Sequence, residues 1–406
     1  MWKIHNKYYN LNDFMDKHPG GKQILESCKN LDATNSFESY HTFSDMKKIS
    51  SIMTKYEIDP EEKSIESEKY TFNNNEFYRE VQREVNKYFI NKSTKWTNNY
   101  LILFLITFIT YIYTFCYTFL GVNNNYQLRI LTSIISASLL LSFSFQVFHD
   151  ATHYAVSKNK FINEFISQIG GGLLLWDWKI WIKHHSIYHH SFTGNYKLDP
   201  DMKHTHPLFK KSEESNACII KNPLIISLSM SIIPGIFVGQ IYSYLLGLYR
   251  RKLWGFKINS SKTILEWIIF IGKFYIMSHN KDYLLMLIYF ISLNINYSIA
   301  ILPDHDQYET ILNKDIKISD WGETQVRNSG NFCPENKIYT RMYGSINYQI
   351  EHHLFPSLCS YHLPEISKIV KKVCQKHDIK YVSNSTLFGA YMSVINNFYK
   401  INNKNC

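Results

Sequence analysis

Two uncharged segments of this sequence are each as long as a membrane is thick, and they limit the folds open to the chain. Residues 101–122 and residues 130–148 contain no charged side chain. A transmembrane helix needs about 20 apolar residues. Because only a short loop separates the two segments, they predict a transmembrane hairpin whose ends both lie on the side of residues 1–99.

Three further apolar segments follow a polar stretch at 150–222. Residues 283–303 are free of charge and predict another membrane span. Residues 223–249 are also uncharged but are interrupted by Pro234-Gly235, whereas 263–279 carry Glu266 and Lys273. Charged side chains are costly at bilayer depth unless they are paired. Hydropathy alone therefore favours 223–249 over 263–279 as a span.

The charge balance excludes some partners. The chain has 44 Lys and Arg against 34 Asp and Glu, a net charge of +10. A basic protein can bind nucleic acid or an anionic membrane surface. The membrane-length segments favour the membrane and exclude nucleic acid. Lys and Arg crowd 1–99, 250–273 and 314–380, which predicts that these parts are cytosolic. The seven cysteines form no CxxC pair, and we expect reduced thiols.

Histidine is the residue type that points to chemistry. Three adjacent His pairs occur, at 184–185, 189–190 and 352–353, although 17 His in 406 residues predict only about 0.7 such pairs. His149 and His153 are four residues apart at the end of a predicted span, so they share one helix face. His185, His189 and His190 repeat this spacing.

Imidazole-rich sites suit iron, copper, zinc or nickel. A structural zinc site needs only four ligands and usually includes cysteine, so seven or more His suggest two metal ions. An isolated HxxxH is more often a surface feature, but three clusters together favour a site. If one centre collects all three, residues 190 and 349 lie on the same membrane face. The chain between them then crosses an even number of times, and one of the three later apolar segments does not cross.

The order HxxxH, HxxxHH and QxxHH resembles the membrane fatty acyl desaturases. Gln349 stands where the first His of the third box is usual, which is typical of the front-end group that acts between an existing double bond and the carboxyl end. Residues 344–356 are similar to the third-box segment. Residues 189–201 resemble the second-box segment of members that introduce the double bond at the fifth carbon.

The resemblance implies an all-α integral membrane desaturase domain, 100–390, with a cytosolic His-rich diiron dome. Its four transmembrane helices would be 101–122, 130–148, 263–279 and 283–303, with 223–249 monotopic or re-entrant. The implied iron ligands are His149, His153, His185, His189, His190, His305, His352 and His353. Gln349 would be a weak ligand or a hydrogen-bond support, and His184 is a less favoured alternative to His185. The family also implies the endoplasmic reticulum, with both termini cytosolic.

The N-terminus carries a second motif. His18-Pro19-Gly20-Gly21 is followed, 23 residues after His18, by His41. Pro-Gly-Gly alone could be a plain turn. Together with Phe37-x-x-x-His41 it resembles the small α+β cytochrome b5 domain, whose two imidazoles bind haem b. Bis-imidazole ligation leaves no axial position for O2, so such a haem carries electrons. We expect this domain at 1–59, short at its N-terminus, followed by a tether at 60–99.

The family implies an O2-dependent reaction that removes hydrogen from two adjacent methylenes of a lipid acyl chain. Two electrons would arrive through the haem from a separate NADH-cytochrome b5 reductase, because no nucleotide-binding loop is recognisable here. The leading hypothesis for the function is a front-end, delta-5-like desaturase of polyunsaturated acyl lipids. A sphingolipid long-chain-base desaturase, a lipid hydroxylase and a haem electron carrier without an iron site remain open.

Several residues outside the histidine boxes also have predicted roles. Trp176, Trp178 and Trp181 are expected as anchors at the membrane interface. Asp150 and Glu351, beside proposed ligands, either orient imidazoles or contact nothing. Residues 361–374 predict an amphipathic helix on the catalytic dome.

Overall fold

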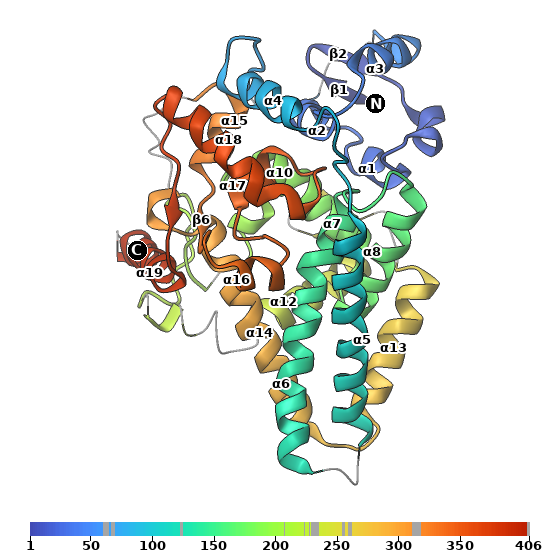
Figure 1. Cartoon of the computed structure of the whole chain (residues 1–406), viewed down its shortest axis with the longest axis vertical. Helices are drawn as coiled ribbons and strands as arrows, with labels where there is room; N and C mark the ends of the chain where they lie inside the picture. Colours follow the sequence, from blue (N-terminus) through green and yellow to red (C-terminus); the bar gives the residue numbers. More distant parts are fainter. Residues whose placement is uncertain are drawn as a thin grey trace.

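The structure, a computed structural model, has a broad head above a narrower helical stem (Figure 1). It describes residues 1–59, 65, 70–121, 125–206, 208–222, 224–226, 228, 235–253, 256–258, 262–310 and 318–403. Residues 60–64 and 66–69 of the predicted tether at 60–99 lie outside the described residues, and so does Pro234. Within 70–99, the tether segment includes helix α4, Phe77–Tyr88, which packs on the head.

The stem consists of helices that run side by side away from the head (Figure 1). They are α5 (Asn98–Leu120), α6 (Tyr126–Phe143), α13 (Ile264–Ser278) and α14 (Tyr283–His305). Helix α6 continues through the π-helix η3 (Ser144–Phe148) into α7 (His149–Thr152). Helix α5 begins where the Thr97 side chain accepts a bond from the Tyr100 amide, and Asn125 caps α6 in the same manner. The predicted first hairpin is therefore present.

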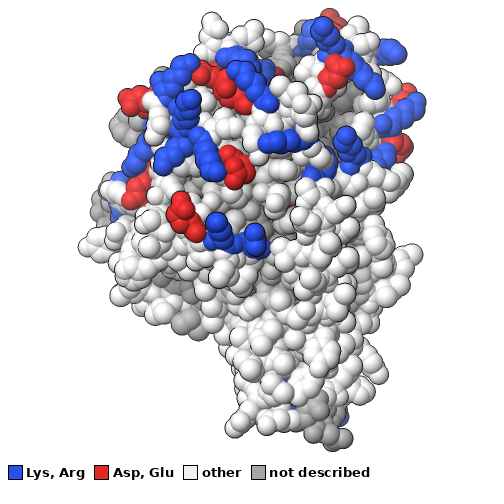
Figure 2. Space-filling view, in the orientation of Figure 1, with Lys and Arg blue, Asp and Glu red and all other residues white. Residues whose placement is uncertain are grey.

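Charged side chains are concentrated on the head, whereas the visible face of the stem carries almost none (Figure 2). In the described residues, three helices are long and apolar enough to cross a membrane: Asn98–Leu120, Tyr126–Thr152 and Tyr283–His305. These correspond to three of the four predicted spans. The fourth, 263–279, forms α13, whose 15 residues fall short of the about 20 needed for a perpendicular crossing.

The two charged residues of α13 are both paired. Glu266 closes a capping box with Thr263 and also accepts a bond from the Trp178 amide at 3.1 Å. Lys273 donates to the Leu173 carbonyl at 2.6 Å. Leu173 lies at the end of α8 and Trp178 at the start of α9, so these charges attach α13 to the head.

The N-terminal unit is a small α+β fold. A three-stranded antiparallel sheet has the order β1-β2-β3, with Trp2 opposite Tyr9 and Tyr8 opposite Ile58. Its elements are β1 (Trp2–Ile4), β2 (Lys7–Tyr9), η1 (Asn12–Lys17), α1 (Lys22–Ser27), α2 (Thr34–Tyr40), α3 (Met46–Met53), η2 (Thr54–Tyr56) and β3 (Glu57–Ile58). Trp2 is fully buried and donates to the Leu25 carbonyl, which joins sheet and helix. The predicted α+β unit is therefore present.

The head is built from short helices between and after the stem hairpins. Its first half contains α8 (Lys160–Leu174), α9 (Trp178–Trp181), the π-helix η4 (Ile182–His189), α10 (His190–Phe192), η5 (Pro200–Met202), α12 (Gly235–Arg250), β4 (Lys252–Leu253) and β5 (Phe256–Lys257). Its second half contains η6 (Tyr308–Thr310), α15 (Trp321–Arg327), β6 (Asn331–Phe332), α16 (Lys337–Met342), α17 (Gln349–Leu354), η7 (Ser360–His362), α18 (Leu363–Lys376), β7 (Ser383–Asn384) and α19 (Leu387–Asn403). As predicted, α18 is amphipathic, with Ile366 and Val370 buried.

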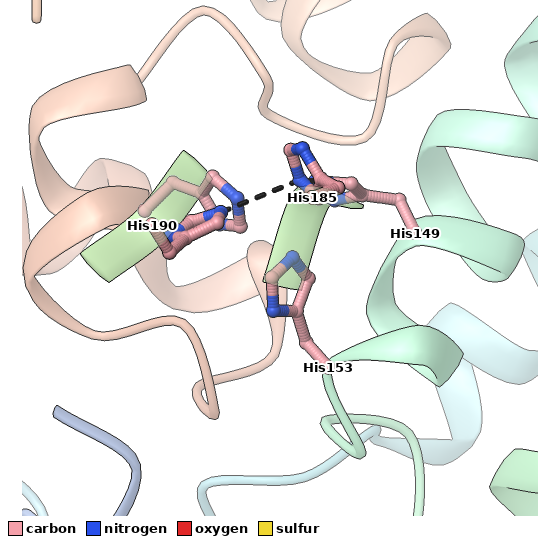
Figure 3. Close-up of side chains that lie close together, drawn as sticks. His149, His153, His185 and His190 are labelled. Atoms are coloured by element: carbon pink, nitrogen blue, oxygen red, sulfur yellow. Dashed lines mark hydrogen bonds between the residues drawn. The ribbon is translucent and has the colours of Figure 1, made fainter. Parts of the chain in front are cut away.

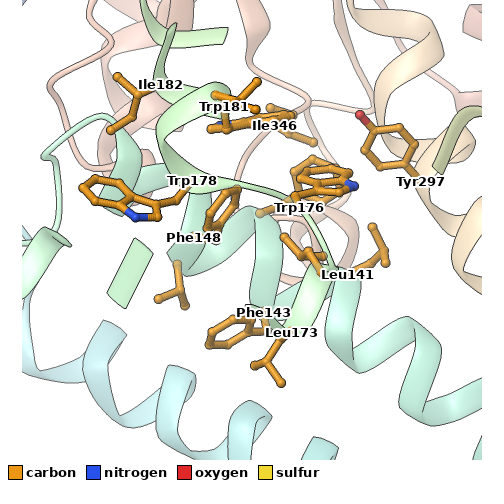
Figure 4. Packing of buried hydrophobic residues seen from close by; sticks show 14 of the residues in the cluster. Leu141, Phe143, Phe148, Leu173, Trp176, Trp178, Trp181, Ile182, Tyr297 and Ile346 are labelled. Carbon is orange, nitrogen blue, oxygen red and sulfur yellow. The ribbon is translucent and has the colours of Figure 1, made fainter. Parts of the chain in front are cut away.

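The three tryptophans do not anchor the chain at an interface. Trp176, Trp178 and Trp181 are 2%, 4% and 6% exposed and belong to the main hydrophobic core (Figure 4). Trp176 and Trp181 stack with their ring centroids 4.8 Å apart, and Trp181 stacks on His185 at 4.6 Å. The prediction of interfacial anchors is wrong because α9 packs beside the histidines of the head, where the tryptophan rings are buried.

The cysteine prediction needs one correction. Cys28, Cys116, Cys333, Cys359 and Cys374 are free, but Cys218 is disulfide-bonded. Sequence spacing detects local CxxC pairs, whereas a disulfide requires only proximity in the folded chain.

Candidate dimetal centre and haem ligands

Eight buried or partly buried histidines from distant segments gather into two adjacent groups in the head. The first contains His149, His153, His185, His190 and His352, and the second contains His189, His305 and His353. Within each group, one ligand atom per residue lies within 4.8 Å of the others. Figure 3 shows four members of the first group turned toward a common centre. All eight predicted ligands are therefore brought together, and residues 190 and 349 lie on one face, as the crossing argument requires.

The second box differs from its predicted geometry. We expected His185 and His189, four residues apart, to share one helix face with His190 as a neighbour, but His185 and His190 enter the first group and His189 enters the second. The cause is η4, a π-helix over Ile182–His189. Its wider turn aligns residues five apart rather than four. His149 and His153, in α7 and at its end, keep the α-helical spacing and share the first group.

The nitrogen–nitrogen distances fit a bound cation. Nε2 of His185 lies 3.0 Å from Nε2 of His149 and 3.3 Å from Nε2 of His190. Nε2 of His189 lies 3.2 Å from Nε2 of His305. Neighbouring imidazole ligands on one ion, each bonded at about 2.0–2.1 Å, have nitrogens about 2.9–3.4 Å apart. Unprotonated nitrogens that face one another repel unless a cation lies between them.

Outer hydrogen bonds fix which nitrogen is free in the second group. His305 Nδ1 donates to the Asn328 carbonyl at 2.8 Å, and His353 Nδ1 donates to the Gln325 side-chain oxygen at 3.0 Å. His189 Nδ1 donates to the carboxylate of Asp199 at 3.1 Å. With each Nδ1 protonated, each Nε2 lone pair faces the group centre. A metal-binding histidine is usually held in this way.

The first group has ligand atoms without protein partners. Nε2 of His153 and Nε2 of His352 are buried and form no hydrogen bond with any residue that the structure describes. A buried polar atom is normally paired, so these two nitrogens indicate a missing partner. Burial, followed by the charges of the neighbouring imidazoles, holds the pKa of both side chains well below its usual range. Both imidazoles are therefore neutral, as a metal ligand must be.

Gln349 occupies the second group beside the histidines. Its side-chain nitrogen lies 2.9 Å from His305 Nε2 and 3.1 Å from His353 Nε2, and its Oε1 is buried without a partner. Rotation of the amide by 180° exchanges these two atoms and is not distinguished by shape. In the rotated form Oε1 faces the same point as the two imidazoles. Gln349 is thus positioned to be the fourth donor of a three-histidine group.

His184 lies outside both groups. Its Nδ1 contacts the Tyr244 hydroxyl at 2.8 Å and its Nε2 contacts Asp201 at 2.6 Å. With both nitrogens in use, it differs from its neighbour His185, which supports the preference for His185. Asp201 also approaches His189 Nδ1 at 3.4 Å. Burial alone would lower the pKa of His189, but the charges of Asp199 and Asp201 raise it to about 9. Without a metal ion, the raised pKa places a proton on Nε2 of His189, and a cation that binds there takes the place of this proton.

Asp150 and Glu351, the carboxylates adjacent in sequence to proposed ligands, form hydrogen bonds with groups other than imidazoles. Asp150 accepts bonds from the indole of Trp96 and from Ser360. Glu351 accepts from Asn331 and Tyr381, and burial raises the pKa of Glu351 to about 7. In the described residues, neither has a hydrogen bond to an imidazole. The orienting carboxylates are Asp199 and Asp201, which we did not assign, although their Asp-Pro-Asp sequence immediately after the second box was the available signal.

The two N-terminal histidines lie at the ring separation expected of two imidazole ligands on one haem iron. The ring centroids of His18 and His41 are 6.2 Å apart. Coaxial imidazoles bonded at about 2 Å to one iron have centroids about 6 Å apart. His18 Nδ1 donates to the Gly21 carbonyl and His41 Nδ1 to the Phe37 carbonyl, so each Nε2 is free to bind. Burial, with the charge of His41, lowers the pKa of His18 to about 4 and keeps it neutral.

Comparison with known proteins agrees with both sites. Residues 124–385 match the fatty acid desaturase family, and residues 1–60 match the cytochrome b5-like haem/steroid-binding domain. Delta(5) fatty acid desaturase A of Dictyostelium discoideum is 26% identical over 443 residues, covering 98% of this chain and 90% of the relative. Acyl-lipid (8-3)-desaturase of Mortierella alpina is 22% identical over 430 residues, covering 96% and 91%.

A third relative, Delta(8)-fatty-acid desaturase 1 of Arabidopsis thaliana, is 23% identical over 400 residues and covers 94% of this chain and 85% of its own length. The relatives therefore extend along nearly the whole chain, and the predicted resemblance is confirmed at the level of family. The chain belongs to the fatty acid desaturase family and carries a cytochrome b5-like domain at its N-terminus.

Proposed function

We propose that the eight clustered histidines hold two iron ions, one in each group, with Gln349 as an additional donor in the second. The observation that carries this proposal is the convergence of imidazole Nε2 atoms 3.0–3.3 Å apart, from segments far apart in the sequence around residues 149, 185–190 and 305. Iron suits imidazole ligands and supplies the O2 activation that an unactivated C–H bond requires. Two groups in contact match the two ions that the histidine count predicts.

The reaction is O2-dependent desaturation of an acyl lipid. One hydrogen leaves each of two adjacent methylenes, a C=C bond forms, and O2 with two external electrons and two protons becomes two waters. In the protein, Trp176 and Trp181 close the floor of the first group and keep bulk water away from it. Asp199 and Asp201 balance positive charge at the second group.

The electrons enter through a haem b held by His18 and His41, and Pro19, Gly20 and Gly21 form the turn beneath it. A bis-imidazole haem has no open axial position and so carries electrons rather than binding O2. Gly20 leaves little room for a side chain, because a Cβ there would lie 2.8 Å from the His18 ring. An NADH-cytochrome b5 reductase, on a separate chain, is the proposed source of electrons.

We infer front-end regiochemistry, with the new double bond at the fifth carbon of a long-chain polyunsaturated acyl group. Gln349 in the third box and the spacing of the second box support this assignment. Two relatives are named delta(5) desaturases and others (8-3) or delta(8) desaturases. A front-end reaction is common to these names, and the fifth carbon is the more specific part of the proposal.

We further propose that α13 is the fourth membrane crossing and that the head faces the cytosol at the endoplasmic reticulum. Helix α13 runs beside α5 in the stem and enters α14 after a short turn (Figure 1). Tilting or local thinning of the bilayer accommodates a short helix at modest cost. Helix α12 instead carries Tyr244, whose hydroxyl reaches His184 in the head. This contact favours a monotopic position for 235–249, whereas residues 223, 227 and 229–234 of the apolar segment lie outside the described residues. The proposed domain limits remain 1–59 and 100–390.

Product analysis tests the function. The full chain would be expressed in a host that is fed separate polyunsaturated acids, and the new double bond would be located by mass spectrometry. We expect a fatty acid with one additional double bond at carbon five. A desaturated long-chain base, a hydroxylated lipid, or haem without non-haem iron would each identify one of the competing functions and refute this one.

Two histidine variants separate the two cofactors. His352→Ala is expected to abolish the product while the haem absorption spectrum stays intact, because His352 belongs only to the dimetal group. His18→Ala is expected to remove the haem spectrum and most turnover while non-haem iron remains. Full activity of His352→Ala would contradict the assignment of the centre.

A further inference from the structure

The haem domain reaches into the dimetal centre through one side chain. Tyr40 is the last residue of α2 and immediately precedes His41. Its hydroxyl lies 2.6 Å from Nδ1 of His153, a member of the first histidine group, and the two rings are nearly parallel with centroids 6.0 Å apart. Tyr40 is therefore covalently linked to His41, a proposed haem ligand, and hydrogen-bonded to His153, a proposed metal ligand.

The direction of this hydrogen bond follows from the second contact of the tyrosine. The Tyr40 hydroxyl donates its proton to the Ser186 carbonyl, 3.2 Å away. Its oxygen is then an acceptor, so Nδ1 of His153 carries the proton and donates it. In that tautomer the lone pair of His153 lies on Nε2, the buried atom that has no hydrogen-bond partner among the described residues. Tyr40 thus does for His153 what Asp199 does for His189.

Further contacts hold α2 in place on the metal-binding segment. Asn35 donates to the Ser191 carbonyl at 2.9 Å, and the Ser36 and Ser191 hydroxyls are 2.8 Å apart. On its other side, Glu38 receives two bonds from the Arg79 guanidinium of α4, at 2.6 and 2.7 Å. Glu38 is 5% exposed, so this ion pair is largely shielded from water. The position of Tyr40 is therefore set from both sides.

We propose that Tyr40 is a positioning residue for His153 and the bonded connection between the haem ligand His41 and the iron centre. This inference rests on the proposed function. The path from His41 to His153 consists of covalent bonds within two adjacent residues and one hydrogen bond. Electron tunnelling is more efficient along such a path than across a gap. In each electron transfer, a ferrous haem held by His18 and His41 would become ferric and the iron centre would gain one electron. A nicotinamide-dependent flavoprotein would then reduce the haem again. Two such transfers are needed for each double bond.

Tyr40→Phe tests the inference because it keeps the ring and removes only the hydroxyl. The full-length protein would be stripped of iron with a chelator and titrated with ferrous iron without O2. Loss of an outer hydrogen-bond partner usually weakens metal binding 10- to 100-fold, and we expect that loss for one of the two irons. The haem absorption spectrum should not change. Tyr56→Phe is the matched control: Tyr56 lies in the same domain and packs on Phe14, away from His153.

The second measurement is the rate of haem reoxidation. Chemically reduced protein, fully loaded with iron and supplied with a lipid that the wild-type chain desaturates, would be mixed with O2 in a stopped-flow instrument. We expect Tyr40→Phe to slow haem reoxidation at least tenfold and Tyr56→Phe to match the wild type. Wild-type iron affinity in Tyr40→Phe would overturn the positioning role, and a wild-type reoxidation rate would overturn the electron path. If the wild-type chain itself forms no double bond, the proposed function fails instead.

Discussion

Replacing Asp199 by asparagine measures what a buried carboxylate contributes to the second iron. Asp199 is 1% exposed and accepts a bond from His189 Nδ1 at 3.1 Å, while Nε2 of the same ring faces His305. Asparagine keeps the size of the side chain but removes its negative charge and replaces one of two acceptor oxygens, which also receive bonds from the Gly194 and Asp201 amides, by an NH2 group. The difference in iron affinity therefore reports what the charged, doubly accepting carboxylate contributes to the bound cation.

The expected magnitude can be bracketed. A divalent ion bound at His189 Nε2 would lie about 7 Å from the carboxylate, and at an effective dielectric constant of about 20 the attraction is about 5 kcal/mol. That value is an upper bound, because solvent and neighbouring dipoles rearrange around the neutral amide. Loss of such outer partners typically weakens metal binding 10- to 100-fold, which corresponds to about 1.4–2.7 kcal/mol. We expect Asp199→Asn to fall in this lower range.

The assay is an anaerobic titration of iron-free, full-length protein with ferrous iron, expressed as iron bound per haem. The wild type should bind two irons tightly, and Asp199→Asn should bind one tightly and the other 10- to 100-fold more weakly. Asp150→Asn is the control, since Asp150 is equally buried beside His149 but bonds to Trp96 and Ser360. Two tightly bound irons in Asp199→Asn, or the same loss in Asp150→Asn, would refute the reasoning.

Three other predictions concern folding, docking and Gln349. Gly344→Ala should lower stability by more than about 2 kcal/mol, because Gly344 has φ +57° and a Cβ would lie 2.4 Å from the Phe145 carbonyl oxygen. Thermal melting in detergent checks this, and Gly272→Ala, where a Cβ meets nothing within 4 Å, should melt like the wild type. Arg79→Ala removes a charged pair worth about 2 kcal/mol, so amide hydrogen exchange in α2 should rise about 30-fold; unchanged exchange would argue against this anchor. Gln349→Ala should weaken only one iron in the titration and leave the haem spectrum intact, and equal loss of both irons would contradict the two-group arrangement.

The sequence predicts the first hairpin and α14 well, because a long uncharged segment has few stable alternatives to a buried helix. It also predicts the bounds of α13 to within one residue at each end, but not the partners of the charged side chains in this helix. From the sequence alone, Glu266 and Lys273 are charges that are costly to bury in a membrane. In the fold they form hydrogen bonds with Trp178 and Leu173, and such partners are set by tertiary structure. The burial of Trp176 is missed for the same reason, since an aromatic residue in a polar stretch can face either a membrane interface or a core.

The identities of the site histidines could be predicted, and their distribution between two groups could not. Spacing rules assume 3.6 residues per turn, and the π-helix over 182–189 breaks that assumption. The outer partners were also missed. Asp199 follows in a loop, and Tyr40 comes from another domain, so no local pattern connects either residue to an imidazole.

Two pairs of consecutive residues, His189-His190 and His352-His353, divide between the groups, and the ring centroids in each pair are 5.7 Å apart. The spacing of the two irons would then be limited by backbone covalent geometry at two places, rather than by the looser packing of helices. Changes in lipid thickness or temperature that shift the stem helices should move both ions as one body.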